Sequence, residues 1–302
     1  MLNTALKSLA WSAVALLMLL SVATPLSGIT IFLLMTPMVV LYTMLRPVSF
    51  AIHIVVIAAL AFLIMGGSGA IALTFGFFFL VPSIVMGHLY KKRTAAKTVV
   101  TVAFVILLAQ LVTELTLFSV QYDIDFTAQL ASFLDQRIQE LQASDLLTGD
   151  WTGTAQAFGE AVVRLLPMLL MLCSFLLAIV THGLSRKVLA WSGIVVPGLT
   201  PMRNWMLPKS TVLLYVIVWI IQFSMPAGSP NFWAVASDNA VPVLDFLFRI
   251  QALAFFFYLA HQKKWSNVVP ILIAIPLFLI QPLYLIGLLD TAFPLRRYFD
   301  KK

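Results

Sequence analysis

The sequence contains little charge. Asp, Glu, Lys and Arg together make up 10% of the chain, hydrophobic residues make up 61%, and the mean hydropathy is +1.00. A soluble globule needs more polar surface than so few charged residues can provide. The composition therefore excludes an ordinary soluble protein and predicts a protein that lies in lipid.

Cysteine is nearly absent, and the motifs of common enzymes are missing. Cys173 is the single cysteine, so one chain can form neither a disulfide framework nor a cysteine-ligated metal site. We interpret Cys173 as a small buried hydrophobe. The sequence has no complete phosphate-binding loop, zinc-protease pair or nucleophile elbow, and its four histidines are separated along the chain. We therefore predict no enzyme activity, no metal and no cofactor.

The basic residues are dispersed rather than gathered. The formal net charge is +7, but short basic clusters alternate with apolar runs, at Lys91 to Arg93, Arg186 and Lys187, Lys263 and Lys264, and Arg296 and Arg297. This spacing is typical of cytoplasmic connectors that face anionic lipid headgroups. The charge therefore indicates the lipid bilayer as a partner and not a nucleic acid.

Hydrophobic runs predict an all-α polytopic transmembrane helical bundle of eight or nine spans. A span needs about 20 apolar residues, and the candidates are Leu6 to Thr24, Ile29 to Leu45, Val48 to Met65, Ala70 to Tyr90, Thr98 to Val120, Ala161 to Gly183, Thr211 to Phe223, Ala240 to Ala260 and Val268 to Leu289. The first resembles a signal peptide, because Lys7 precedes an apolar core, but the runs directly after it favour a retained helix. In the last, Pro270, Pro276 and Pro282 can break the helix. A re-entrant hairpin with eight crossings is therefore the alternative to nine.

Charge also predicts an orientation. With the amino terminus in the cytoplasm, the basic connectors from Arg46 to Lys264 fall inside with no acid among them, which fits the positive-inside rule. Nine crossings would carry the basic residues after Asp290 to the outside, whereas a re-entrant hairpin would return them. We expect a multi-pass protein of the bacterial cytoplasmic membrane.

One long polar loop separates the fifth and sixth spans. Residues Gln121 to Glu160 carry seven acids and one arginine. Apolar residues recur at helical spacing from Phe126 to Leu141, and Asp125 can cap this segment. The pattern predicts an amphipathic helix on the outer surface, followed by a turn between Asp145 and Gly153. This helix is either a lid over the outer mouth of the protein or a plain surface helix.

The chain divides in two at about Ser185. We predict a six-span membrane domain over residues 1–185, including the loop 121–160, and a C-terminal membrane region over residues 186–302. The second part begins with a connector, residues 191–209, that is rich in Pro, Gly and Trp. Such a composition favours an elbow at the inner headgroup level, where Arg203, Trp205 and Lys209 contact lipid or, alternatively, a partner protein.

Four ionisable residues lie well inside the predicted spans: Glu114, Arg164, Asp245 and Arg249. At about 1.5 Å per residue from the outer span ends, all four fall in the outer half of the membrane. Gln110 precedes Glu114 by one helical turn and Asp245 precedes Arg249 by four residues, so each pair shares a helix face. An ionisable side chain in lipid is costly unless it is paired or hydrated.

These residues fit two roles. In one, Glu114 with Arg164 and Asp245 with Arg249 form interhelical clasps that only neutralise buried charge. In the other, they line a small-ligand pocket together with Gln110, the arginines holding an anionic group and the acids holding donors.

Two motifs resemble a known family. PMRNWMLP, from Pro201 to Pro208, and GLLDTAFPLRR, from Gly287 to Arg297, resemble the cytoplasmic and C-terminal signatures of the YybS-like family of predicted bacterial membrane proteins. In the plan of its first six spans, the chain also resembles the substrate-binding subunits of energy-coupling-factor vitamin transporters and, more weakly, the cell-shape protein MreD. These last two likenesses are analogies of fold.

The transporter resemblance implies capture of a vitamin or metabolite from outside by a protein without its own ATPase. A separate ATPase module would dock on the cytoplasmic helices, with Ala95 and Ala96 as candidate contacts. The alternative is a non-transporting membrane scaffold that recruits envelope-synthesis or signalling proteins through the connector 191–209.

Overall fold

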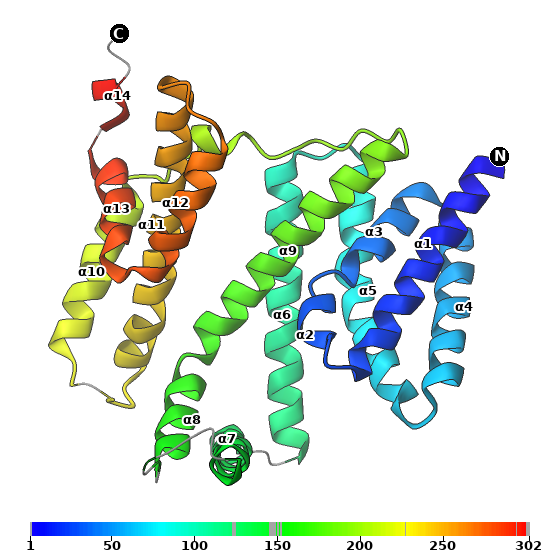
Figure 1. The fold of residues 1–302 in the computed structure, drawn as a ribbon, viewed down its shortest axis with the longest axis horizontal. Coiled ribbons are helices and arrows are strands. Elements are labelled where there is room, and N and C mark those ends of the chain that lie inside the picture. The colour runs from blue at the N-terminus through cyan, green and yellow to red at the C-terminus, as the bar shows by residue number, and fades with distance from the viewer. Residues whose placement is uncertain are drawn as a thin grey trace. The chain divides into compact units, whose positions relative to one another are not determined.

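The computed structural model of the chain is helical. It describes residues 2–122, 125–144, 149, 151, 153–226, 228–293 and 295–299, and over these residues it contains helices and turns but no strand (Figure 1). Five helical stretches are long and apolar enough to cross a membrane: Ala5–Ala23, Pro47–Lys91, Ala96–Gln121, Leu166–Trp191 and Phe232–Gln262. The predicted all-α membrane fold is confirmed.

The chain folds as two compact units. Unit 1 contains the helices α1 to α6 and α9 from Leu170, and it ends at Leu199; unit 2 contains α7, α8 and the start of α9 through Leu169, and the chain from Thr200. The sequence predicts a division at about Ser185, with the loop 121–160 in the first part. By contacts, the helices of that loop belong with the C-terminal part, and the connector 191–209 is divided between the two units.

Unit 1 follows most of the predicted spans. Its helices are α1 (Leu2–Leu20), α2 (Ser27–Thr30), α3 (Met35–Met44), α4 (Pro47–Met65), α5 (Gly69–Lys91), α6 (Ala96–Tyr122) and most of α9 (Leu166–Trp191). A 3-10 turn, Gly66–Ser68, joins α4 to α5. The predicted span from Ile29 to Leu45 is instead divided into α2 and α3. The ten residues of α3 rise about 15 Å, half of a hydrocarbon layer about 30 Å thick.

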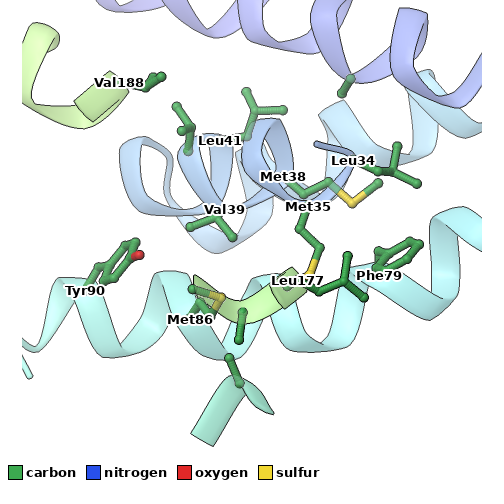
Figure 2. Packing of buried hydrophobic residues seen from close by; sticks show 14 of the residues in the cluster. Leu34, Met35, Met38, Val39, Leu41, Phe79, Met86, Tyr90, Leu177 and Val188 are labelled. Carbon is green, nitrogen blue, oxygen red and sulfur yellow. The ribbon is translucent and has the colours of Figure 1, made fainter. Parts of the chain in front are cut away.

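The short helix α3 forms the centre of the unit 1 core. Seven consecutive residues, Met35 to Leu41, are buried. A helix that is apolar on every side is stable only inside a protein, and α3 packs against both α1 and α5. Figure 2 shows Met35 and Val39 pointing toward α5, where Phe79 and Met86 belong to the same buried cluster. The residues between α2 and α4 therefore form the centre of the unit 1 core.

In unit 2, α7 (Phe126–Ala143) and α8 (Thr154–Arg164) pack against each other. The Asp125 carboxylate accepts a hydrogen bond of 3.0 Å from the Ala128 N–H, so the predicted helix and its cap are both present. Gly159 allows close packing, because a Cβ there would lie 3.1 Å from the Thr127 carbonyl oxygen. Residues 145–148, 150 and 152 of the predicted turn lie outside the described residues.

The rest of unit 2 is a long helix with shorter helices packed on it. These are α10 (Ser210–Ser224), α11 (Phe232–Gln262), α12 (Val268–Leu279), α13 (Tyr284–Ala292) and α14 (Leu295–Phe299). The predicted last span is broken at a 3-10 turn, Gln281–Leu283. Both α12 and α13 pack on α11, and α13 runs back toward the end of α11 at which α12 begins (Figure 1). α12 and α13 therefore form a helical hairpin on α11.

Gly287 lets α13 lie directly on the backbone of α11. A Cβ at this position would overlap the Phe248 carbonyl oxygen and would lie 2.7 Å from the Ala252 nitrogen. A side chain therefore cannot be accommodated without moving one helix away from the other. This contact accounts for the glycine that opens the second family motif. Pro294 of the same motif lies outside the described residues.

Candidate functional site

Unit 1 contains a pocket of about 220 Å³, lined by α5, α6 and α9 and by residues next to α2. Its lining is mostly apolar and includes four phenylalanines, Phe32, Phe75, Phe78 and Phe79. Three lining residues are polar or ionisable: Thr74, Glu114 and Cys173. Cys173 is exposed, so its interpretation as a buried hydrophobe is wrong. The prediction rested on the apolar neighbours of Cys173 in the sequence, which do not show that its side of α9 lines a pocket.

Glu114 is the only carboxylic acid among the described residues that line this pocket. It lies on α6, within the apolar stretch Ala96–Gln121, and it is exposed. Among the described residues of unit 1 it has neither an ion-pair partner nor a hydrogen-bond partner. A carboxylate in apolar surroundings requires a donor, a counter-charge or a proton. The Glu114 carboxylate therefore lacks a polar partner among the described residues of unit 1.

Gln110, one turn before Glu114, has a partner in the backbone. Its Nε2 donates to the Phe78 carbonyl oxygen at 3.2 Å. In a regular helix that carbonyl would accept from the N–H four residues later, but that residue is Pro82, which has no N–H. Gln110 replaces the missing donor, as neighbouring helices commonly do at prolines in membranes.

Arg249 has the same role in unit 2. Its Nη1 donates to the Phe278 carbonyl oxygen at 3.1 Å, and the residue four positions later is Pro282. That carbonyl, near the end of α12, therefore also lacks its helical donor. Asp245 accepts a hydrogen bond of 2.9 Å from the Tyr215 hydroxyl. The two residues that share a face of α11 thus each bind a different neighbour.

Arg164 pairs with an acid that the sequence analysis did not select. Its guanidinium binds Asp238 at 2.5 Å and donates to the Ser229 carbonyl oxygen at 3.1 Å. Gln222 donates to the other oxygen of Asp238 at 3.2 Å. Asp238 lies two positions before the predicted start of its span, which is why a search restricted to span interiors missed it. A clasp is present at Arg164, and its acid is Asp238.

Asn239 bridges the break between α8 and α9. Its Nδ2 donates to the Arg164 carbonyl oxygen at 3.0 Å, and its Oδ1 accepts from the Met168 N–H at 2.9 Å. In an uninterrupted helix that carbonyl and that N–H would bond to each other. The amide therefore satisfies both groups where the helix is interrupted at Leu165, and it ties this junction to α11.

The two motifs that resemble the YybS-like family meet in one polar network. Arg296 binds Asp290 at 2.9 Å and donates to the carbonyl oxygens of Arg203 and Trp205 at 2.7 and 2.8 Å. Gln251 of α11 donates to Asp290 at 2.6 Å and accepts from the Leu207 N–H at 3.0 Å. The side chain of Asp290 is 0% exposed and that of Arg296 is 12% exposed. Contacts between the two motifs therefore hold unit 2 together near the C-terminal end of α11.

Some of the connector residues that were predicted to contact lipid or a partner form hydrogen bonds within the chain, and some are exposed. The Trp205 indole donates to the Thr200 carbonyl oxygen at 2.8 Å, and the Arg203 guanidinium donates to His261 at 3.2 Å. Arg203 and Lys209 remain exposed. Ala96, the candidate contact for an ATPase module, is only 4% exposed, so a partner cannot reach it; Ala95 is exposed.

The predicted four-charge site is distributed over both units. Glu114 belongs to unit 1, whereas Arg164, Asp245 and Arg249 belong to unit 2. A single pocket built from all four stays a prediction. The described contacts give Arg164, Asp245 and Arg249 partners inside unit 2, and they leave Glu114 at a pocket of its own.

Comparison with known proteins agrees with the motifs. No solved structure matches the chain. The chain is 23% identical to the uncharacterized protein YybS of Bacillus subtilis (strain 168), over 94% of each protein. The family model described as a predicted membrane protein, DUF2232, matches residues 12–291. Because this match covers most of the chain, the protein belongs to the DUF2232 family of predicted membrane proteins, as its resemblance to the YybS-like family indicated.

Proposed function

We propose that this multi-pass membrane protein is a small-molecule binding or transport component without its own ATPase, and that unit 1 holds the ligand. The observation that carries the proposal is the pocket of about 220 Å³ with a mostly apolar lining and with Glu114, which has no partner among the described residues of unit 1. Binding sites combine apolar walls with a few polar groups that orient the ligand. An ionisable residue within a membrane span is a functional candidate by default.

The contrast with the other intramembrane polar residues supports this choice. Gln110 and Arg249 bind carbonyl oxygens that prolines leave without donors, and Arg164 binds Asp238. Each therefore has a structural reason to be present. Glu114 has no such partner among the described residues of unit 1, and an ionisable side chain in an apolar membrane stretch is costly unless it is paired or hydrated.

The orientation belongs to the same proposal. With the amino terminus in the cytoplasm of a bacterial cell, the basic connectors face inside. The tail was the exception to this rule, but Arg296 lies against the backbone of Arg203 and Trp205 in unit 2. A hairpin that keeps the tail and the connector on one side favours eight crossings. A separate ATPase module would then bind the cytoplasmic side.

Native mass spectrometry of the full chain tests this function, after incubation with a small-molecule extract and release from detergent. We expect a bound mass below that of a lipid. Thr74→Trp should abolish it, since Thr74 lines the pocket and its side chain is exposed enough to accept a larger one. Val105→Trp is the matched control, because Val105 lies on α6, is 54% exposed and does not line the pocket. Equal binding by both variants contradicts the proposal.

The scaffold function is the second candidate, because part of the connector is strongly exposed. Trp191 is 81% exposed and Val195 is 82% exposed, and exposed large apolar side chains are typical of contact surfaces. The same purification separates the two functions. A stable protein partner without a bound small molecule supports the scaffold, and a bound small molecule that depends on Thr74 supports the binding component.

A further inference from the structure

The charge of the pocket specifies the class of ligand. We infer that the unit 1 pocket binds a small organic cation, an amine carried on a single ring or a short apolar chain. This inference rests on the proposed function, and it replaces the anionic ligand that the arginines suggested. It rests on three features of this pocket: an unpaired carboxylate, several phenylalanine rings, and a described lining that contains no basic residue.

The carboxylate decides the sign of the ligand's charge. Glu114 is the only charged residue of the lining, and an anion placed beside it would add repulsion in a medium of low dielectric constant. A protonated amine would supply both the counter-charge and the hydrogen-bond donors that the carboxylate lacks. The arginines that could hold an anion belong to unit 2 and do not line this pocket: Arg164 pairs with Asp238, and Arg249 donates to the Phe278 carbonyl oxygen.

The rings decide what surrounds the charge. Phe32, Phe75, Phe78 and Phe79 all line the pocket, and Phe78 and Phe79 meet edge to face with ring centroids 4.8 Å apart. The faces of aromatic rings attract cations, and the remaining apolar wall favours a ligand with an apolar body. The backbone carbonyl of Phe78 is already occupied by Gln110. The carboxylate of Glu114 is therefore the principal acceptor for the amine.

The volume limits the size of the ligand. Pockets for drug-sized molecules hold roughly 300–1,000 Å³, and this pocket holds about 220 Å³. A molecule with one ring and one amine fits such a space better than a fused-ring compound. A primary amine can also be supplied by a lipid headgroup, so an experiment must distinguish a free amine from phosphatidylethanolamine.

Cys173 provides a reporter in the native sequence. It is the single cysteine of the chain, it is exposed, and it lines the same pocket as Glu114. A ligand in the pocket should slow its alkylation. The rate of modification by N-ethylmaleimide can be measured on the full chain in phosphatidylglycerol nanodiscs, which contain no amine headgroup. Three probes of similar size are compared: phenethylamine, the neutral phenylethanol and the anionic phenylacetate.

We expect phenethylamine to slow alkylation at least fivefold and phenylacetate to have no effect. Glu114→Gln should raise the phenethylamine concentration needed for half-maximal protection at least tenfold, whereas the same change in charge at the exposed Glu140 of α7, Glu140→Gln, should not alter it. Phosphatidylethanolamine in the nanodisc, if it protects Cys173 only when Glu114 is present, identifies the cation as a lipid headgroup.

Other outcomes overturn the inference and separate it from the proposed function. Equal protection by phenylethanol or phenylacetate, or protection by phenethylamine that Glu114→Gln leaves intact, excludes a cation site. If Thr74→Trp still abolishes protection in that case, the pocket binds small molecules of another class and the proposed function stands. If no probe protects Cys173 and no bound mass depends on Thr74, both are wrong.

Discussion

The two units of the chain differ in whether their ionisable side chains have partners. Unit 1 is built around an apolar helix, α3, and Glu114, an acid within the apolar stretch of α6, lies at a pocket without a partner among the described residues of the unit. Unit 2 joins its helices through ion pairs, a partly exposed one between Arg164 and Asp238 and a largely buried one between Arg296 and Asp290. A charge that has a partner inside a membrane protein fixes packing, and a charge that lacks one invites a ligand. The difference directs the search for function to unit 1.

The largest effect should come from breaking a buried pair of unit 2. Arg296→Met leaves Asp290 buried without its counter-charge, which typically costs about 3–5 kcal/mol of the free energy of unfolding. The double variant Arg296→Met with Asp290→Asn should recover more than half of the loss, because no charge is then left unpaired. Thermal unfolding of the purified protein measures both.

The exposed pair of α7 is the control for that experiment. Arg137 and Glu140 lie 2.6 Å apart, with side chains 57% and 63% exposed. Arg137→Met should therefore change stability by less than about 1 kcal/mol. A loss at Arg137 as large as that at Arg296 would show that burial does not set the strength of these pairs.

A smaller loss is expected from adding one carbon between α11 and α13. Gly287→Ala places a Cβ against the Phe248 carbonyl oxygen, and overpacking of this kind costs about 1–3 kcal/mol. Gly183→Ala on α9 is the matched change in unit 1, since a Cβ there meets no atom within 4 Å. It should be neutral or stabilising by up to about 1 kcal/mol, because Ala favours a helix over Gly. Unfolding temperatures compare the two variants.

The bond between Gln110 and Phe78 can be tested by restoring the missing donor. Gln110→Leu should cost about 0.5–1.5 kcal/mol, the usual net value of one hydrogen bond. In a Pro82→Ala background the N–H of residue 82 can bind the Phe78 carbonyl, so the same change should cost less. A double-mutant cycle on unfolding free energies measures this coupling. Equal costs in both backgrounds would exclude the proposed compensation for proline.

The smallest effect on stability is expected at Glu114. Because this carboxylate makes no described bond in unit 1, Glu114→Gln should change the free energy of unfolding by less than about 0.5 kcal/mol. Asp290→Asn, at a carboxylate held by Arg296 and Gln251, should be clearly more destabilising. A stability loss at Glu114 that matches the loss at Asp290 would assign Glu114 to packing.

Local signals determined the parts of the fold that were predicted correctly. Hydropathy gave the membrane class and most helix positions, and helical spacing with a capping residue gave α7 and Asp125. The prolines of the last predicted span indicated its break. The two family motifs were also visible in the sequence, although their contact in one network was not.

Tertiary structure decided the rest, because the relevant partners are distant in the chain. Gln110, Arg249 and Arg164 bind groups 32, 29 and 74 positions away, and no local pattern specifies which carbonyl or acid each will meet. The burial of α3 and the opening beside Cys173 likewise depend on how other helices pack. The sequence alone determined that this is a helical membrane protein with a few costly polar groups in its spans. Only the packing of helices decided which of those groups are satisfied, and it left Glu114 as the one to test for a ligand.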